Sequence, residues 1–374
     1  MRTGPATSAG DPARAAQRRR FLLRCAPLTH CTTCYTSSVI LGLGVSPMRR
    51  REFIALVGSG VAGWPLAARA QQAAMPVVGF IRDGSADANA RNVAAFRKGL
   101  NETGTVEGQN VTVEYHWLEG RHDHLPALMA DLVRRQVAVI ATAGNVPALA
   151  AKAATATTPI VFGIGDDPVR LGLVTSLARP GGNATGINFF NAELTAKRLR
   201  LLHDLVPKAV RIAVLLNPAN ASSTESQLRI VQEAAPTVGL QLQILNATTI
   251  GEIDAAFATL ERERPDALFV AGDAFFISRA VQFATLTARG RIPATYSVRD
   301  HVAVGGLMSY GTDFTEAFRQ VGVYTSKILK GAKPVDLPVV QSTKFEFIIN
   351  MQTARALGLE VPPQLLATVD EVIE

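Results

Sequence analysis

The sequence predicts an α/β protein of two lobes, each a parallel sheet flanked by helices, with a ligand cleft between the lobes. From Met75 onward, short β-rich runs alternate with amphipathic helical segments, and repeated β-α-β units form parallel sheets covered by helices. About ten such strands fall within about 300 residues, which fits two sheets better than one. Hydrophobic residues make up 48% of the chain and charged residues 18%, so disorder is excluded as its main state.

The first half of the body predicts five strands, where apolar residues run together or alternate with polar ones. These strands are residues 77–81, 111–117, 137–141, 159–162 and 184–189. Apolar residues at helical spacing predict the helices between them. Their faces are Val93, Phe96 and Leu100, then Leu125, Leu128, Met129 and Leu132, and an Ala-rich segment over 146–154.

The second half repeats this rhythm. Thr249 and Glu252 form a capping box that opens a helix with Ile253 and Leu260 on its apolar face. Further helices are expected at 193–206, 222–238, 275–289, 314–330 and from 351. Strands are expected at 211–216, 240–245, 267–270, 294–296, 307–310 and 345–350. We expect the first lobe to comprise 75–190 plus about 300–338, and the second 191–299 plus about 339–374.

Residues 48–70 have the layout of an export signal. The basic cluster 49–51 precedes a short apolar run, and Ala68-Arg69-Ala70 forms a small-residue cleavage site. The double arginine before Glu52-Phe53-Ile54 resembles a twin-arginine signal, although the general export route stays open. The apolar run is shorter than the roughly 20 residues of a membrane span, and no Cys follows Ala70 for a lipid anchor. We expect a periplasmic protein without a direct membrane anchor, and residues 1–47 as an extension from a misassigned start codon.

The positive charge of the chain belongs to this leader. The formal net charge is +7, but residues 1–70 hold ten Arg and two acidic residues, which leaves 28 basic and 29 acidic side chains in 71–374. A body with this balance lacks the basic surface of a nucleic-acid-binding protein. Cys25, Cys31 and Cys34 also lie in the leader, so the body has no disulfide, thiol catalysis or Cys-ligated metal.

Polar, glycine-containing loops follow the predicted strands, and ligands of open α/β sheets bind outside the carboxyl ends of the strands. These loops precede helix N-termini, whose free amides favour an anion. Each polar residue of these loops could instead only cap a helix or form a turn. Each aromatic residue could instead pack in the core. The predicted ligand-binding residues are Ser85, Thr142, Asn145, Asp166, Asp167, Asn217, Asp273, Phe276, Tyr296 and Tyr310.

An amino acid would divide its charges between the two lobes. Asp273 of the second lobe would then face the ammonium group, while Ser85 and Thr142 of the first lobe would suit the carboxylate. Catalytic sets are missing: the body has no G-x-S-x-G nucleophile elbow and no P-loop. His122 and His124 fit a polar turn better than a metal site. We therefore expect no enzymatic activity, no cofactor and no metal.

Several motifs are spread over the body: Val106-Glu-Gly-Gln-Asn-Val, Pro180-Gly-Gly-Asn-Ala-Thr-Gly, Gly305-Gly-Leu-Met-Ser-Tyr-Gly and Gly331-Ala-Lys-Pro-Val-Asp-Leu-Pro-Val. Together with the Leu-Pro-Ala-Leu at 125–128, the Phe-Glu-Phe at 345–347 and the segment 356–363, they resemble ABC-transporter substrate-binding proteins related to the tryptophan/tyrosine-binding type. The resemblance runs from Met75 to Glu374. It implies a type I periplasmic-binding-protein fold, in which two lobes joined by three linkers clamp a ligand.

The leading interpretation is a monomeric binding protein that delivers a small solute, first of all an amino acid, to the permease subunits of an ABC importer. Two other classes share an α/β scaffold. An enzyme is disfavoured because no nucleophile, base or metal set is recognisable. The ligand-sensing core of a transcription regulator would need a basic helix-turn-helix before the first lobe, where an export signal stands. The sequence leaves the identity of the ligand open.

Overall fold

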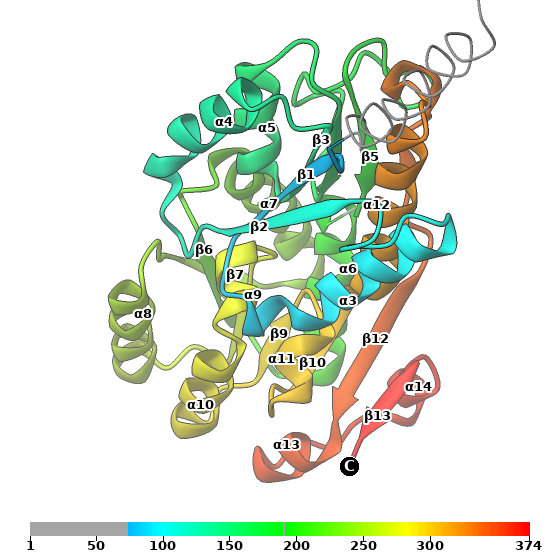
Figure 1. Ribbon diagram of the computed structural model, residues 1–374. Helices are drawn as coiled ribbons and strands as arrows, with labels where there is room; N and C mark the ends of the chain where they lie inside the picture. The colour runs from blue at the N-terminus through cyan, green and yellow to red at the C-terminus, as the bar shows by residue number, and fades with distance from the viewer. Residues whose placement is uncertain (1–73, 190) are drawn as a thin grey trace, which may run out of the picture. The chain divides into compact units, whose positions relative to one another are not determined.

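The computed structural model describes residues 74–189 and 191–374, and these residues fold around two sheets with helices on the faces of each (Figure 1). The two-lobed α/β fold expected from the sequence is confirmed. The predicted extension 1–47, the export signal 48–70 and the junction at 190 lie outside the described residues. Within the part of the chain that is described, no helix combines the length and the apolar character of a membrane span.

The first sheet contains six parallel strands in the order β11-β5-β4-β3-β1-β2. These are β1 (Val77–Arg82), β2 (Thr112–Trp117), β3 (Val139–Ala143), β4 (Ile160–Ile164), β5 (Ala184–Asn188) and β11 (Val340–Gln341). Alternate residues of β1 face opposite layers, because side chains of a strand point to opposite faces of the sheet. Phe80 packs with helices α3 (Ala90–Glu102) and α12 (Phe314–Leu329), whereas Ile81 packs with α4 (Leu125–Arg134) and α5 (Asn145–Ala154).

The second sheet contains seven strands in the order β13-β12-β10-β9-β8-β6-β7. They are β6 (Arg211–Leu216), β7 (Gln241–Asn246), β8 (Ala267–Val270), β9 (Ala294–Tyr296), β10 (Met308–Thr312), β12 (Phe345–Asn350) and β13 (Glu371–Ile373). Strand β12 runs antiparallel to β10, so this sheet is not wholly parallel as expected. The chain reaches β12 from the first lobe, and it can therefore enter the second sheet in the opposite direction.

Helices cover both faces of the second sheet. Helices α6 (Asn191–Leu205) and α7 (Ala221–Ala234) share one core with Ile212 and Phe269. Helices α8 (Ile250–Glu263) and α10 (Ala280–Gly290) share the other core with Leu215 and Leu268. The remaining helices are α9 (Ala274–Ser278), α11 (Arg299–Ala303), α13 (Met351–Ala356), α14 (Pro363–Leu366) and the short 3-10 turns η1 (Asp87–Asn89), η2 (His122–His124), η3 (Ala235–Val238) and η4 (Pro334–Asp336).

Sheet membership differs from the expected lobe division at two places. Strand β10 pairs with β9 and β12, so it belongs to the second sheet although it lies within 300–338. Strand β11 pairs with β5 and belongs to the first sheet although it lies within 339–374. Asp313 follows β10 and caps α12 by accepting hydrogen bonds from the amides of Thr315 and Glu316. We therefore propose a crossing between the lobes at Asp313 and another just after β11.

Helices α3 and α12 are far apart in the sequence and lie side by side against the first sheet (Figure 1). Two glycines permit this close packing. A methyl group at Gly99 of α3 would overlap the backbone of Arg319, and one at Gly322 of α12 would overlap the backbone of Phe96. The crossing fixes α12 to the first lobe and places its N-terminal residue Phe314 near the carboxyl ends of the strands.

Candidate functional site

A cavity of about 50 Å³ lies where strand-end loops of both lobes meet. This is the edge at which open α/β sheets bind their ligands. The first lobe contributes residues that follow or end β1, β3, β4 and β5, and the second lobe contributes residues from the loops and helices after β6 and β8. The wall is formed by Arg82, Ala143, Gly144, Asn145, Gly165, Phe189, Asn220, Ser223, Gly272, Asp273, Ala274, Ile277 and Phe314.

Arg82 is the last residue of β1 and supplies the positive charge of this wall. Its side chain lies on the same face of the strand as Phe80, and the residue is only 3% exposed. The guanidinium carbon lies 4.5 Å from the ring centre of Phe318 and 5.8 Å from that of Phe314. Among the described residues it has no ion pair or side-chain hydrogen bond. Burial lowers the pKa of Arg82 to about 10, against the opposing charges of Asp300 and Asp83, so the side chain stays protonated at neutral pH.

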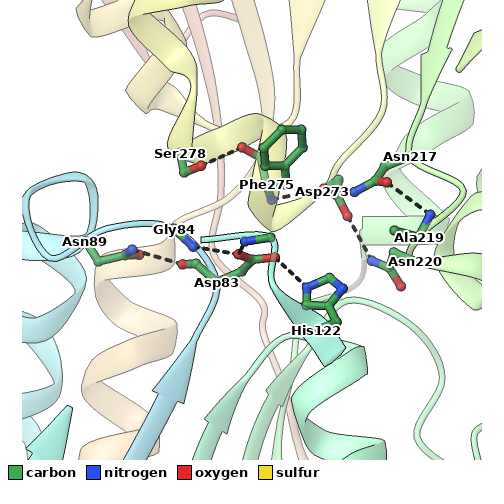
Figure 2. Close-up of polar contacts among 11 residues, drawn as sticks. Asp83, Gly84, Asn89, His122, Asn217, Ala219, Asn220, Asp273, Phe275 and Ser278 are labelled. Carbon is green, nitrogen blue, oxygen red and sulfur yellow. Dashed lines mark hydrogen bonds and ion pairs between the residues drawn. The ribbon is translucent and has the colours of Figure 1, made fainter. Parts of the chain in front are cut away.

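Asp83 follows Arg82 and is held inside the first lobe (Figure 2). Its Oδ1 accepts hydrogen bonds from the amides of Gly84 at 2.8 Å and Gly120 at 2.7 Å, and its Oδ2 lies 2.8 Å from Nε2 of His122. Burial acts to raise the pKa of Asp83, but these hydrogen bonds outweigh it and lower the pKa. Gly84 has a φ of 85°, and a side chain there would collide with Ser278 of the second lobe.

Asp273 supplies the negative charge on the side of the second lobe. It caps helix α9 through a hydrogen bond of 3.0 Å from the amide of Phe275. The side-chain amides of Asn217 and Asn220 donate to its two oxygens at 2.8 and 3.0 Å (Figure 2). Burial raises the pKa of Asp273 despite these bonds, and the nearby charge of Asp83 raises it further.

Neutral polar groups complete the wall. In the first lobe, Nδ2 of Asn145 donates to Oδ2 of Asp166 at 2.6 Å, while Oδ1 of Asn145 is buried and has no hydrogen-bond partner among the described residues. In the second lobe, the side chain of Gln227 forms hydrogen bonds with both backbone polar groups of Gly272. Its Oε1 accepts from the Gly272 amide at 2.7 Å, and its Nε2 donates to the Gly272 oxygen at 3.1 Å and to Ser223 Oγ at 2.9 Å.

The structure brings four of the predicted ligand-binding residues together. Asn145 and Asp273 form part of the wall, and Asp166 and Asn217 are their hydrogen-bond partners. Direct ligand contact by these side chains stays a prediction.

Six predicted residues lie away from the wall. Ser85 and Asp167 accept backbone hydrogen bonds in turns, from Ala88 and from Val169. Thr142 is buried within β3. The three aromatic residues occupy cores, because their strands and helices turn them inward: Phe276 packs edge-on against Phe283, Tyr296 stacks on His301 and Tyr310 packs edge-on against Phe347.

Several residues of the wall are absent from the predicted set, among them Arg82, Asn220, Ser223, Phe189 and Phe314. Arg82 carried a usable signal. In the strand 77–82 it shares a face with Val78 and Phe80, which is the face directed at helix α3. A charged residue at the buried end of such a face points to a binding site. Phe314 gave no comparable signal, because its place depends on how α12 crosses the first sheet.

The two imidazoles of η2 lie in different surroundings. His122 is paired with Asp83, while His124 is exposed beside Asp123. Over residues 74–189 and 191–374, no group of three or more His, Cys, Asp and Glu side chains is arranged to hold a metal ion.

Comparisons with known proteins match this architecture. The sequence profile of the family described as ABC transporter substrate binding protein matches residues 77–373. A tyrosine-binding protein of Clostridioides difficile (strain R20291) is 27% identical over 265 residues, which cover 71% of this chain and 76% of the relative.

Two solved structures are similar in fold. The ABC domain from Streptococcus pneumoniae in complex with L-Trp superposes with a TM-score of 0.73 at 24% identity, over 80% of this chain and 100% of that one. The ligand-free, open structure of a substrate-binding protein with adhesive properties from Clostridium difficile gives a TM-score of 0.57 at 25% identity, over 80% of this chain and 99% of that one. At 24% identity, the similarity to the Streptococcus pneumoniae structure supports the fold alone.

Proposed function

Because the chain belongs to the ABC transporter substrate-binding protein family, we propose that it captures an amino acid between its two lobes and delivers it to the permease subunits of an ABC importer. The family and the tyrosine-binding relative support a solute-binding role. The amino-acid ligand is proposed by extension from this relative and from the charges of the cavity wall.

The observation that carries the proposal is the shared construction of the cavity. Arg82 and Asn145 come from the first lobe, and Asn220 and Asp273 come from the second. A solute that touches both groups binds the closed arrangement of the lobes more tightly than an open one. Its differential affinity would shift the population toward closure, which is the form that a permease can recognise.

The proposed site of action is the periplasm. The export signal predicted over residues 48–70 supports this location, and no anchor is expected to remain after cleavage near Ala70. The binding-protein family points to capture without chemical conversion. We propose that the protein acts as a monomer.

A ligand screen tests this function. The mature chain from Gln71 is purified after partial unfolding and refolding, which removes solute carried over from the host. Thermal-shift measurements across the standard amino acids and a set of sugars follow, and calorimetric titration checks each positive result. A ligand present at a hundredfold excess over its Kd should stabilise the protein by about 2.7 kcal/mol. Stabilisation only by sugars would contradict the amino-acid assignment, and steady conversion of a compound would contradict the binding role.

A further inference from the structure

We propose that Arg82 makes the site selective for solutes that carry a carboxylate group, acting as the anion anchor of the first lobe. This inference rests on the proposed capture of a solute in the cavity and names the chemistry that the solute must present. Arg82 replaces Ser85 and Thr142, the predicted partners of the carboxylate, because these two residues lie away from the cavity wall.

Within the described residues, the charge of Arg82 has no ion pair. The guanidinium group is buried over the rings of Phe314 and Phe318, and both Arg82 and Phe314 line the cavity. Its Nε atom is buried without a hydrogen-bond partner among the described residues. Aromatic faces compensate a desolvated cation only in part, since such contacts contribute less than an ion pair with good hydrogen bonds.

Neither of the nearby carboxylates replaces a ligand. Asp83 already accepts hydrogen bonds from Gly84, Gly120 and His122. Asp300 attracts Arg82 electrostatically, but no ion pair joins them within 4.0 Å. The fork of a guanidinium group matches a carboxylate through two parallel hydrogen bonds. A ligand carboxylate in the cavity would therefore pair with a buried charge that residues 74–189 and 191–374 leave without an ion pair.

The opposite lobe complements this arrangement. Asp273 lies on the wall contributed by the second lobe and carries the charge that an ammonium group requires. A zwitterion would thus meet a cation on one lobe and an anion on the other. An amine without the carboxylate, or an uncharged sugar, would leave Arg82 buried and unpaired in the closed form.

The test combines a protein variant with a ligand variant. Wild type, Arg82→Met and Arg82→Lys are titrated calorimetrically with L-tyrosine and with tyramine, its decarboxylated amine, at pH 7. If the amino-acid screen finds a tighter ligand, that amino acid and its amine are used in the same way. Arg170→Met, which removes an exposed charge of the same lobe, is the control.

We expect wild type to bind the amino acid at least about 30-fold more tightly than the amine, which is the lower range for truncating one partner of a buried charged pair. Arg82→Met should abolish this preference, and Arg82→Lys should retain part of it. Without ligand, Arg82→Met should melt at the same temperature as wild type or higher, because Met fills the space over Phe318 and removes an unpaired charge. An arginine with a purely structural role would instead lower the melting temperature when replaced.

Two results would overturn the inference. In the first, a folded Arg82→Met protein still binds the amino acid more tightly than the amine, by the same ratio as wild type. This result would exclude Arg82 as the anchor and leave the proposed capture function intact. The other is a wild-type protein that no amino acid and no monocarboxylate, such as 3-(4-hydroxyphenyl)propionate, stabilises. Monocarboxylates could stabilise wild type but not Arg82→Met, while amino acids stabilise neither protein. That result would support Arg82 as the carboxylate anchor and would contradict the amino-acid ligand.

Discussion

Nε2 of His122 lies 2.8 Å from Oδ2 of Asp83, so the turn before α4 is tied to the carboxyl end of β1. Only 20% of the His122 side chain and 8% of the Asp83 side chain are exposed. The hydrogen bond to Asp83 raises the pKa of His122 against the opposing effect of burial. We therefore expect the pair to make the stability of the first lobe depend on pH.

The first prediction concerns this pH dependence. A raised histidine pKa stabilises the folded protein below the unfolded value of about 6.5, and this contribution disappears as the pH rises through the folded pKa. A lowered aspartate pKa stabilises the folded protein at pH values above the ordinary aspartate pKa of about 3.8. This contribution disappears as the pH falls through the folded pKa of Asp83. His122→Ala should thus lower the free energy of unfolding by about 1–2 kcal/mol near pH 5–6, and by less toward pH 8. Urea unfolding of both proteins across this range gives the difference.

His124→Ala is the matched control for this series. His124 belongs to the same turn, but 68% of its side chain is exposed and its contact with Asp123 is 3.5 Å long. Its replacement should change the free energy of unfolding by less than about 0.5 kcal/mol at any pH. A His122→Ala effect that does not vary with pH would show that the imidazole acts through packing alone.

The second prediction concerns the crossing of α3 and α12. Gly99→Ala and Gly322→Ala each place a methyl group on a backbone that cannot move without separating the helices. We expect each substitution to lower the free energy of unfolding by about 1–3 kcal/mol or more. Gly251→Ala in α8 is the control, because open space surrounds that position. It should raise stability by up to about 1 kcal/mol. Equal effects at all three glycines would contradict the close packing.

The third prediction concerns a second buried cation, Arg198 of α6. The residue is 0% exposed and its guanidinium carbon lies 4.4 Å from the ring centre of Phe269, and its Nη2 donates a hydrogen bond of 3.5 Å to Oε1 of Gln227. Burial lowers the pKa of Arg198 to about 9. Oε1 of Gln227 also accepts a hydrogen bond from the amide of Gly272, so it keeps a partner when the arginine is replaced.

Arg198→Met should therefore raise the free energy of unfolding by about 1–2 kcal/mol at pH 7. A base whose folded pKa lies below its unfolded value is penalised while charged, so the gain should shrink as the pH rises above about 9. Chemical unfolding at pH 7 and pH 10 measures both effects. Arg200→Met, on the exposed side of the same helix, should change little. A destabilised Arg198→Met protein would assign the guanidinium group a structural role through Gln227.

Much of the fold follows from hydrophobic patterning, and the departures have local causes. Strands β11 and β13 contain two and three residues, and none of these is fully buried, so no periodic pattern marks them. The segment expected as one helix over 275–289 is interrupted at Arg279, which leaves the helical conformation between α9 and α10. A hydroxyl hydrogen bond from Ser278 to the oxygen of Phe275 accompanies this break.

The site was less predictable than the fold. The rule that ligands bind at strand ends pointed to the loops after the strands, and several of these loops line the cavity, while ligand contact stays a prediction. Of the predicted side chains it placed only Asn145 and Asp273 on the wall, since neighbouring residues at a strand end point to opposite faces. Arg82 and Asp83 show the difference: one lines the cavity, and the other turns inward to Gly120 and His122. Tyr296 and Tyr310 fill cores for the same reason.

The last prediction concerns Asp273 as the partner of a ligand ammonium group. Asp273→Asn removes the charge and keeps an oxygen that can cap α9, so folding should survive; loss of the cap itself would cost only about 1 kcal/mol. Burial raises the pKa of Asp273, which means that its charged form costs more free energy in the folded protein than in the unfolded chain, and the variant should be no less stable than wild type at pH 7. Affinity for the amino acid should nevertheless fall by about 2–5 kcal/mol, because the ammonium group would be buried without its counter-charge.

The pH dependence of binding separates this role from capping. If the ionised carboxylate holds the ammonium group, the affinity of wild type should fall as the pH drops toward the raised pKa of Asp273, and the weak affinity of Asp273→Asn should not change over that range. Calorimetric titration at several pH values, with circular dichroism to verify folding, measures this. Asp254→Asn, an exposed aspartate of the second lobe, should bind like wild type throughout. Unchanged affinity in a folded Asp273→Asn protein would assign Asp273 to capping, and the ammonium partner would have to be sought at Asp166, the hydrogen-bond partner of Asn145 in the first lobe.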